Sequence, residues 1–284
     1  MKILVTGAYG LLGTDLCERL SKQHEVIAVG HNSGEQRVDI GKGGEVMRLY
    51  ADAKPDFVIN NAAYCDVDGC ERNPELSEHV NVVGTCVTAR LAGEWGIPYL
   101  YVSTDCVFDG TKSSPYLETD APNPITVYGS DKLKGEQATA QFSKKHYIAR
   151  TSLLFGKQRK TFATVILESA RDGKPIKAAK DITGTPSSTK DVADAIAKMI
   201  ELQPEFGIYH VVNSGYGTRL ELAQETLKIA GLTADLEAVN FADLNSAAKR
   251  PPFSALSNEK LASIGIKMRD WREALADFVR ESTE

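Results

Sequence analysis

The sequence predicts an α/β fold: a doubly wound parallel sheet of the Rossmann type with a smaller C-terminal substrate-binding lobe. Short β-branched runs alternate with longer amphipathic stretches, which is the pattern of βαβ units. Runs such as DFVIN and YLYVS are apolar nearly throughout, as expected for strands covered on both faces. The glycine-rich stretch GAYGLLG follows the first run and opens the first helix-like stretch.

The elements follow in chain order. The first half predicts strands at KILVTG, EVIAVG, DFVINNAA and PYLYVST, with helices at residues 11–23, 43–53 and 73–96 between them. After HYIARTSLLFG the order is looser, with helices predicted at 161–173, 190–203, 219–230 and 271–281 and a strand at YHVVN. A second glycine fingerprint is absent from this half. We therefore expect an NAD(P)-binding domain over residues 1–153 and a substrate-binding lobe over 154–284, partly interwoven with it.

Composition narrows the class of protein. The chain has 284 residues, 42% of them hydrophobic and 25% charged, with a net charge of −5, which is ordinary globular composition without a general attraction to nucleic acid or anionic membranes. No signal peptide or membrane-spanning run is recognisable. The 5 cysteines are odd in number and lie mostly in apolar runs, so we expect reduced, buried, inert thiols and a cytoplasmic location. These are Cys17, Cys65, Cys70, Cys86 and Cys106.

The glycines Gly7, Gly10 and Gly13 predict a dinucleotide site. Between a strand and a helix they allow a tight turn, close approach of the backbone to a pyrophosphate, and free N–H groups at the helix start. The second strand should end near Val29, where an NAD-selective site usually places a carboxylate. This chain has Gly30-His31-Asn32-Ser33 there, so NADPH is favoured, with NADH as the alternative.

Three other features border this predicted site. Asp39-Ile40 follows the short QRV run, where it would either border the adenine or cap a strand end. Thr104 ends the apolar run YLYV at the same edge of the sheet, where its hydroxyl can hydrogen-bond a carbonyl. Tyr128 and Lys132 lie four residues apart on a predicted helix, and a neighbouring ammonium should lower the pKa of a phenol. Together they predict a proton-transfer group beside a hydride donor.

At this point the sequence resembles the dTDP-4-dehydrorhamnose reductase family of the extended short-chain dehydrogenase/reductases. The matching motifs span nearly the whole chain: GAYGLLG, VDI, NNAAYCDVDGCE, NVVGT, STDCVFDG, YLETDAPNPITVYGSDKLKGE, RTSLLFG, ITGTPSSTKDVADAI and RPPFSALSNEKL. The resemblance implies a catalytic trio of Thr104, Tyr128 and Lys132. It also implies cofactor contacts from Gly7, Tyr9, Gly10, Leu11, Gly13, His31, Asp39, Ile40, Ala62, Ala63, Tyr64, Tyr128 and Lys132.

The implied reaction is the NADPH-dependent reduction of the C4 keto group of a nucleotide-linked 4-keto-6-deoxy sugar, dTDP-4-dehydrorhamnose to dTDP-rhamnose. Tyr128 would deliver the proton, Thr104 would hydrogen-bond the same oxygen, and Lys132 would acidify Tyr128 and hold the nicotinamide ribose. The expected substrate contacts are Asp105, Cys106, Leu153 and Arg250. Family members usually have an aromatic residue where this chain has Cys106, often have Trp at Leu153, and frequently have Asn at Thr161, so the sugar pocket is expected to differ from the family's.

Two alternatives remain open at this stage. The family includes relatives that serve as non-catalytic regulatory subunits, although the complete Thr104, Tyr128 and Lys132 set argues against that role. A related nucleotide-sugar epimerase, dehydratase or other ketoreductase would use the same scaffold, but a dehydratase usually carries an acidic pair where this chain has Asp105-Cys106. The spacing of residues indicates no metal site, and the resemblance allows a homodimer.

Overall fold

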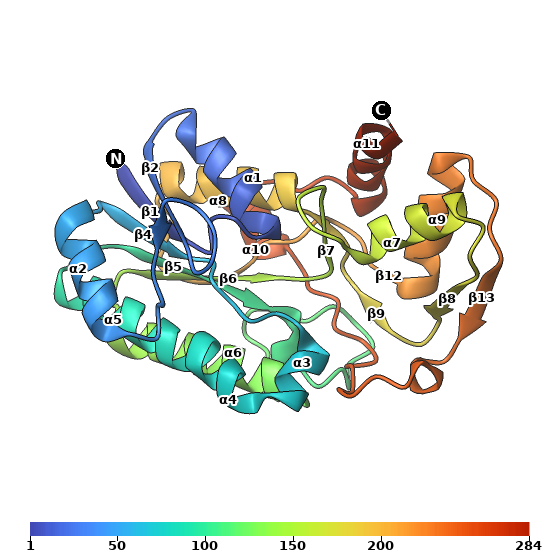
Figure 1. Cartoon of the computed structure of the whole chain (residues 1–284), viewed down its shortest axis with the longest axis horizontal. Coiled ribbons are helices and arrows are strands. Elements are labelled where there is room, and N and C mark those ends of the chain that lie inside the picture. Colours follow the sequence, from blue (N-terminus) through green and yellow to red (C-terminus); the bar gives the residue numbers. More distant parts are fainter. Residues whose placement is uncertain (284) are drawn as a thin grey trace.

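The computed structural model describes residues 1–283, and its larger lobe is built on one seven-stranded sheet with the order β11-β6-β5-β4-β1-β2-β3 (Figure 1). All neighbouring strands pair in parallel. The strands are β1 (Lys2–Thr6), β2 (Glu25–Gly30), β3 (Gln36–Arg37), β4 (Phe57–Asn60), β5 (Tyr99–Thr104), β6 (His146–Thr151) and β11 (Gly207–His210). The chain winds outward in one direction from β1 and in the other from β4, so the predicted doubly wound fold is confirmed and its switch point lies between these two strands.

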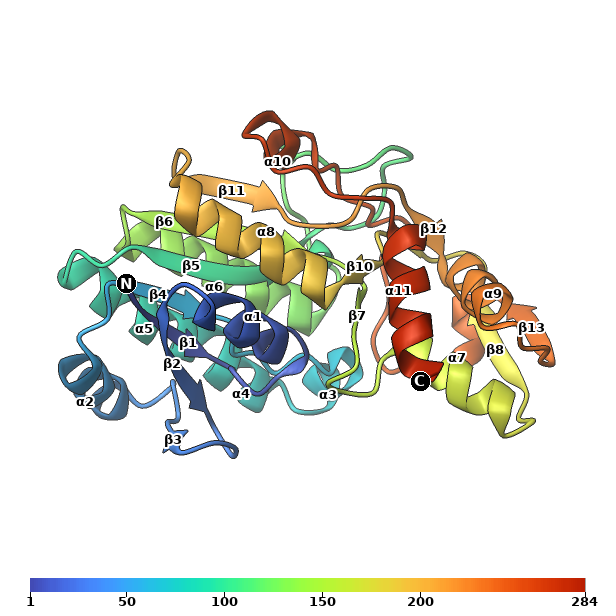
Figure 2. The ribbon, with the colours of Figure 1, turned by 90° about the horizontal axis from the view of Figure 1, so that it is seen from above.

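Helices cover both faces of this sheet, as Figure 2 shows from above. One face carries α1 (Leu11–Ser21) and α8 (Thr189–Leu202), whose apolar side chains share a core with β1, β4 and β5. The opposite face carries α2 (Gly43–Ala53), α5 (Thr85–Glu94) and α6 (Val127–Phe142). Every residue of β4 and of β5 is buried, which explains why their sequences are apolar instead of alternating.

The predicted helix over residues 73–96 is divided into three parts. It consists of α4 (Pro74–Ser77), a π-helical segment (Glu78–Gly84) and α5. A short α3 (Val67–Arg72) precedes it. The wider π-helical turn is a frequent feature of functional sites because it redirects side chains that a regular helix would place elsewhere.

The smaller lobe consists of short sheets and helices at the other end of the molecule (Figure 2). Its two-stranded pairs are β7 (Leu154–Phe155) with β10 (Ser187–Ser188), β8 (Ile176–Ala179) with β13 (Leu236–Val239), and β9 (Thr183–Gly184) with β12 (Gly217–Thr218). Its helices are α7 (Phe162–Arg171), α9 (Arg219–Ala230) and α11 (Trp271–Thr283), while α10 (Glu259–Ser263) packs beside β11. Short 3₁₀ turns lie at Asp105–Val107 and Phe241–Leu244.

The chain returns to the large sheet after the predicted domain boundary at residue 153. Helix α8 packs against α1, and β11 pairs with β6 at the sheet edge. The division of the chain into two domains at that residue therefore stays a prediction.

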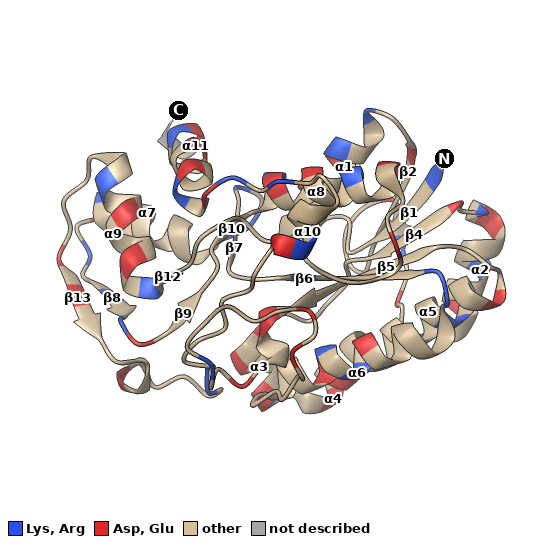
Figure 3. Cartoon of the chain, turned by 180° about the vertical axis from the view of Figure 1, so that it is seen from behind, with Lys and Arg blue, Asp and Glu red and all other residues tan. Residues whose placement is uncertain are grey.

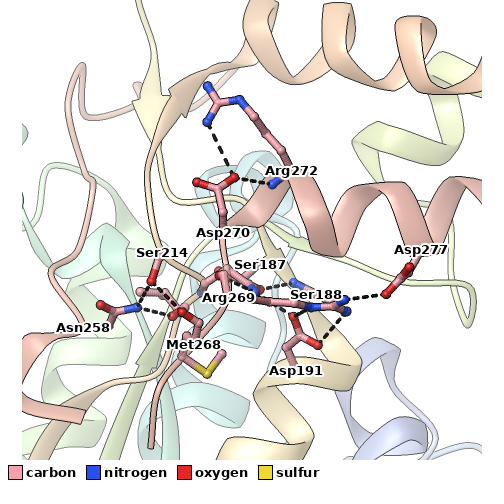
Figure 4. Close-up of polar contacts among 12 residues, drawn as sticks. Ser187, Ser188, Asp191, Ser214, Asn258, Met268, Arg269, Asp270, Arg272 and Asp277 are labelled. Atoms are coloured by element: carbon pink, nitrogen blue, oxygen red, sulfur yellow. Dashed lines mark hydrogen bonds and ion pairs between the residues drawn. The ribbon is translucent and has the colours of Figure 1, made fainter. Parts of the chain in front are cut away.

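A polar network joins α8 to α11 and so connects the lobes (Figure 4). The Arg269 guanidinium donates to both Asp191 carboxylate oxygens, at 2.8 and 3.0 Å, and also pairs with Asp277. The Asn213 amide donates to Asp191 at 2.7 Å. Because Asp191 lies on α8 and Asp277 on α11, Arg269 links the two helices.

The expectation of buried thiols is largely wrong. All five cysteines are free, but only Cys70 is buried; Cys65 is exposed and the other three are intermediate. Cys65 follows β4 and Cys106 follows β5, so both lie where strands leave the sheet interior. Over residues 1–283, no helix combines the length and the apolar character needed to cross a bilayer.

Candidate active site

The glycine loop between β1 and α1 forms a close backbone cradle. Gly7 has a φ of +65°, and a Cβ there would lie 2.7 Å from the Asn61 carbonyl oxygen. A Cβ on Gly13 would lie 2.1 Å from the Gly7 carbonyl oxygen. Gly10 is the N-cap of α1 and supplies no side-chain cap, so the first N–H groups of the helix remain open to an anion. These features fit the pyrophosphate of a dinucleotide.

His31 is the first residue of the loop that follows β2, and the Tyr9 ring packs against the same loop. The Tyr9 ring contacts this loop so closely that a Cβ on Gly34 would lie 2.2 Å from it. His31 is exposed, and no carboxylate occupies positions 30–33. Leu11 is the first residue of α1. Positions 30–33 therefore carry no carboxylate that would repel a 2′-phosphate.

Asp39 is held by His79, a residue that no sequence motif singled out. The Asp39 carboxylate lies 3.0 Å from His79 Nε2 and accepts the Gly41 N–H at 3.0 Å. Burial acts to raise the pKa of Asp39, but these hydrogen bonds and the nearby imidazoles outweigh it, and the pKa lies below its ordinary value. Ile40 packs against Gly84. His79 belongs to the π-helical segment.

The segment after β4 is shaped by another residue of the same π-helix. Asn81 is buried, accepts the Tyr64 N–H at 3.0 Å and donates to the Tyr64 carbonyl oxygen at 3.0 Å. The Ala62 N–H lies against Thr6 and Asn60 oxygens. The predicted cofactor residues Ala62, Ala63 and Tyr64 thus lie beside the glycine loop, across the switch point from β1.

Thr104 and Tyr128 meet in one cleft of about 230 Å³ at the carboxyl edge of the sheet. Thr104 ends β5, and Tyr128 lies in the first turn of α6. The Val127 N–H at the start of that helix donates to the Glu71 carboxylate at 2.9 Å, which anchors the helix end. The other lining residues are Cys65, Val67, Asp105, Cys106, Thr151, Ser152, Leu153, Leu154, Ile182, Thr183, Arg219, Arg250, Pro251 and Ser254.

The expected lowering of the Tyr128 pKa is wrong for the protein alone. Burial raises the pKa of Tyr128 well above its ordinary value, and a hydrogen bond with Thr104 opposes this only in part. Lys132 is itself buried: its ammonium donates to the Val102 carbonyl oxygen at 2.7 Å and lies 4.0 Å from the Tyr101 ring centroid. Desolvation lowers the pKa of Lys132 to about 7, so at neutral pH it is only a partial cation.

The buried ammonium leads to a stability prediction for Lys132→Met. Folded Lys132 has a pKa of about 7, below the ~10.4 of an unfolded lysine, so unfolding takes up a proton between these pH values and stability rises with pH. We expect the variant without cofactor to be more stable than the parent at pH 7, and its advantage in unfolding free energy should fall by about 2 kcal/mol between pH 7 and pH 9. Chemical denaturation at both pH values measures this.

Lys134→Met is the matched control, since Lys134 lies on the same helix with a half-exposed side chain and pairs with Asp131 at 3.0 Å. Its unfolding free energy should keep the parental dependence on pH. A Lys132→Met variant with that same dependence would contradict the low pKa.

Asp105 is engaged by three hydroxyl groups. Its carboxylate accepts hydrogen bonds from Ser152 at 2.8 Å, Ser254 at 2.5 Å and Thr104 at 3.1 Å. Burial raises the pKa of Asp105, and these hydrogen bonds act to lower it. The carboxylate therefore links the end of β5 to the segment after β6 and to the segment around Ser254. Sequence reasoning missed Ser152 and Ser254, although both lie inside matched motifs.

The remaining predicted substrate residues line the same cleft. Leu153 has a φ of +46°, a left-handed conformation that costs a non-glycine residue free energy and clusters at functional sites. The Cys106 N–H donates to Thr104 Oγ1 at 3.2 Å. Arg250 pairs with Asp68 at 3.3 Å. Thr161 is absent from the lining and instead caps α7, where its hydroxyl accepts the Thr164 N–H.

Arg219 lines this cleft too and was missed by the sequence analysis. It is the first residue of α9, and its guanidinium lies 5.4 Å from the Phe162 ring centroid. The stretch YGTRLE contains no signal for a site, because a single arginine at a helix start is ordinary surface chemistry. In the part of the chain that the structure describes, no three His, Cys, Asp or Glu side chains gather as metal ligands would.

Known proteins resemble this chain over its whole length. The family model for the RmlD substrate binding domain matches residues 1–284. Spore coat polysaccharide biosynthesis protein SpsK of Bacillus subtilis is 34% identical over 99% of this chain and 97% of that protein. The dTDP-4-dehydrorhamnose reductase of Burkholderia thailandensis is 33% identical over 99% of both chains.

Solved structures agree with these relatives. A dTDP-4-dehydrorhamnose reductase from Clostridium acetobutylicum superposes with a TM-score of 0.94 at 31% identity, covering 100% of both chains. The reductase from Bacillus anthracis, determined in complex with NADP, gives a TM-score of 0.93 at 29% identity over 99% of both chains.

Proposed function

We propose that this protein reduces dTDP-4-dehydrorhamnose to dTDP-rhamnose. The chain belongs to the RmlD substrate-binding domain family and is an NAD(P)H-dependent nucleotide-sugar ketoreductase. The observation that carries the proposal is that the hydrogen-bonded Thr104 and Tyr128 hydroxyls line one cleft at the carboxyl edge of the sheet. Full-length similarity to proteins named for this reaction supports the choice of sugar.

The cleft residues divide the chemistry between them. NADPH, when bound, supplies the hydride that adds to the C4 carbon of the sugar. The carbonyl electron pair then moves onto oxygen, where the Thr104 hydroxyl hydrogen-bonds the developing alkoxide and Tyr128 transfers its proton to it. The high pKa of Tyr128 keeps the phenol protonated at neutral pH, which is the form that a proton donor needs. Lys132, one turn further along α6, donates to the Val102 carbonyl oxygen and would hold the nicotinamide ribose.

The cofactor cradle favours NADPH. Gly7, Gly10 and Gly13 would hold the pyrophosphate, with Tyr9, Leu11 and His31 toward the adenosine end. Asp39, Ile40, Ala62, Ala63 and Tyr64 would complete the cofactor contacts. Absence of a carboxylate at positions 30–33 removes repulsion against a 2′-phosphate, and one similar reductase was crystallised with NADP.

A substrate and cofactor panel tests the proposal. NADPH oxidation is followed with dTDP-4-dehydrorhamnose and other 4-keto-6-deoxy nucleotide-sugars, then repeated with NADH. We expect the highest kcat/KM for dTDP-4-dehydrorhamnose, and NADPH to be used at least as well as NADH. A different preferred sugar would reassign the substrate, a clear NADH preference would overturn the cofactor assignment, and no turnover with any sugar would favour a regulatory subunit.

A further inference from the structure

The His79 imidazole and the Asp39 carboxylate form a hydrogen-bonded pair in the segment that follows β3. His79 Nε2 lies 3.0 Å from one carboxylate oxygen and 3.1 Å from the other, so a single N–H is shared between them. Although burial acts to raise the pKa of Asp39, its hydrogen bonds keep that pKa below the ordinary value. The carboxylate is therefore ionised at neutral pH and can only accept, and Nε2 of His79 carries the hydrogen.

Close packing holds this pair in place. The His79 ring lies against the backbone of the Asp39 segment, since a Cβ on Gly41 would lie 2.4 Å from the ring. The π-helical segment also packs against the next residue after Asp39, because a Cβ on Gly84 would lie 2.5 Å from the Ile40 side chain. The imidazole therefore has little room to turn away from the carboxylate.

The charges around Asp39 leave His79 as its principal partner. The Lys42 ammonium is 3.9 Å from the carboxylate, beyond hydrogen-bond distance, and its 61% exposed side chain also pairs with Glu45 at 3.3 Å. His31 contributes an electrostatic interaction without a hydrogen bond. Helix α2, which contains Glu45, carries residues of both signs (Figure 3). In the described part of the chain, His79 is thus the side chain that hydrogen-bonds the carboxylate.

The carboxylate keeps acceptor capacity for a ligand. Its Oδ1 atom accepts the Gly41 N–H at 3.0 Å as well as a share of the His79 hydrogen. Within the structure as described, Oδ2 accepts only its share of that hydrogen, although a carboxylate oxygen has two lone pairs. The Asp39 side chain is 17% exposed, so the carboxylate is open to a ligand on one side.

We propose that His79 is a positioning residue of the cofactor site: it orients Asp39 so that Oδ2 accepts a hydrogen bond from the adenine amino group of NADPH. An amino group offers N–H donors, and an ionised carboxylate is their complementary acceptor. This inference rests on the proposed function for the presence of a dinucleotide in the cradle. His79 acts through Asp39 and does not contact the cofactor. Because adenine is common to NADPH and NADH, His79 is expected to serve both.

Cofactor titrations test the assignment without turnover. The dissociation constants of NADPH and NADH are measured by fluorescence, and that of ADP-ribose by calorimetry, on the parent, His79→Leu and His79→Gln. His79→Leu removes the donor that orients the carboxylate, so all three ligands should bind about 5- to 20-fold more weakly. A glutamine can place its side-chain N–H close to the position of Nε2, so His79→Gln should restore most of the affinity.

A double-mutant cycle shows whether His79 acts through Asp39. In Asp39→Ala no carboxylate remains to be oriented, so adding His79→Leu should change the NADPH Kd by less than about twofold. His146→Leu is the matched control. It removes an imidazole whose Nδ1 lies 2.6 Å from the Ser143 carbonyl oxygen, at the start of β6 and so at the opposite edge of the sheet, and it should bind NADPH as the parent does.

The inference and the proposed function fail separately. Parental affinity in His79→Leu would overturn the positioning role, as would an equal loss with and without the Asp39 carboxylate, or a His79→Gln protein as weak as His79→Leu. Weakening of NADPH alone would also overturn it, because that pattern would place His79 at the 2′-phosphate. A parent that binds NADPH in a His79-dependent way but reduces no sugar would instead reject the function and leave the positioning role supported.

Discussion

Replacing Tyr128 with Phe is expected to lower kcat by about 10²–10⁴-fold, the usual contribution of a positioned general acid. The ring and its packing are kept, while the hydroxyl that shares the cleft with Thr104 is lost. The thermal unfolding temperature and the Kd for NADPH should therefore stay close to the parental values. Steady-state NADPH oxidation with the sugar identified by the panel gives kcat, and fluorescence titration gives the cofactor Kd.

Tyr216→Phe is the matched control for this substitution. Tyr216 is exposed in the loop before β12 and is not among the residues that line the cleft. The same chemical change there should leave kcat unaltered. A Tyr128→Phe enzyme with parental kcat would reject the proposed proton donor, whereas a loss of NADPH binding would indicate that the hydroxyl belongs to the cofactor site instead.

The second large effect is expected on stability, from Glu136→Gln. Glu136 and Arg150 form a two-pronged buried ion pair at 2.8 and 2.7 Å, with side chains only 4% and 1% exposed. Ser103 donates a further hydrogen bond to the Glu136 carboxylate at 2.6 Å. Removing the carboxylate charge leaves the Arg150 guanidinium buried without a counter-ion, which typically costs about 3–5 kcal/mol. Urea denaturation of the parent and variant measures the difference in free energy of unfolding.

A double variant separates the cost of an unpaired charge from the loss of the ion pair. Glu136→Leu combined with Arg150→Met replaces two buried charges with apolar groups of similar size, and this change is often close to neutral. We therefore expect the double variant to be more stable than Glu136→Gln alone. If the double variant is the less stable one, then the hydrogen bond from Ser103 and the packing around it outweigh the unpaired charge.

The sequence located features whose geometry is local. Three glycines after the first strand specify the cradle, since Gly7 has a positive φ and a Cβ on Gly13 would clash with the Gly7 carbonyl oxygen of the same loop. Tyr128 and Lys132 lie one turn apart on α6, as their spacing predicts for any helix. The order of strands and helices was also readable, because the apolar runs of β4 and β5 reflect burial on both faces.

Only the tertiary structure decided what these side chains contact and how they ionise. Arg219 reaches the cleft, and Ser254 bonds Asp105 across 149 residues of sequence, through chain paths that no local pattern encodes. The same limit applies to the pKa of Tyr128. The spacing places a lysine one turn away, but burial removes water from both groups. Desolvation therefore raises the pKa of the Tyr128 phenol and lowers the pKa of the Lys132 ammonium, which was expected to make the phenol more acidic. Chain-local spacing determines which groups are neighbours, whereas desolvation depends on every element packed around them.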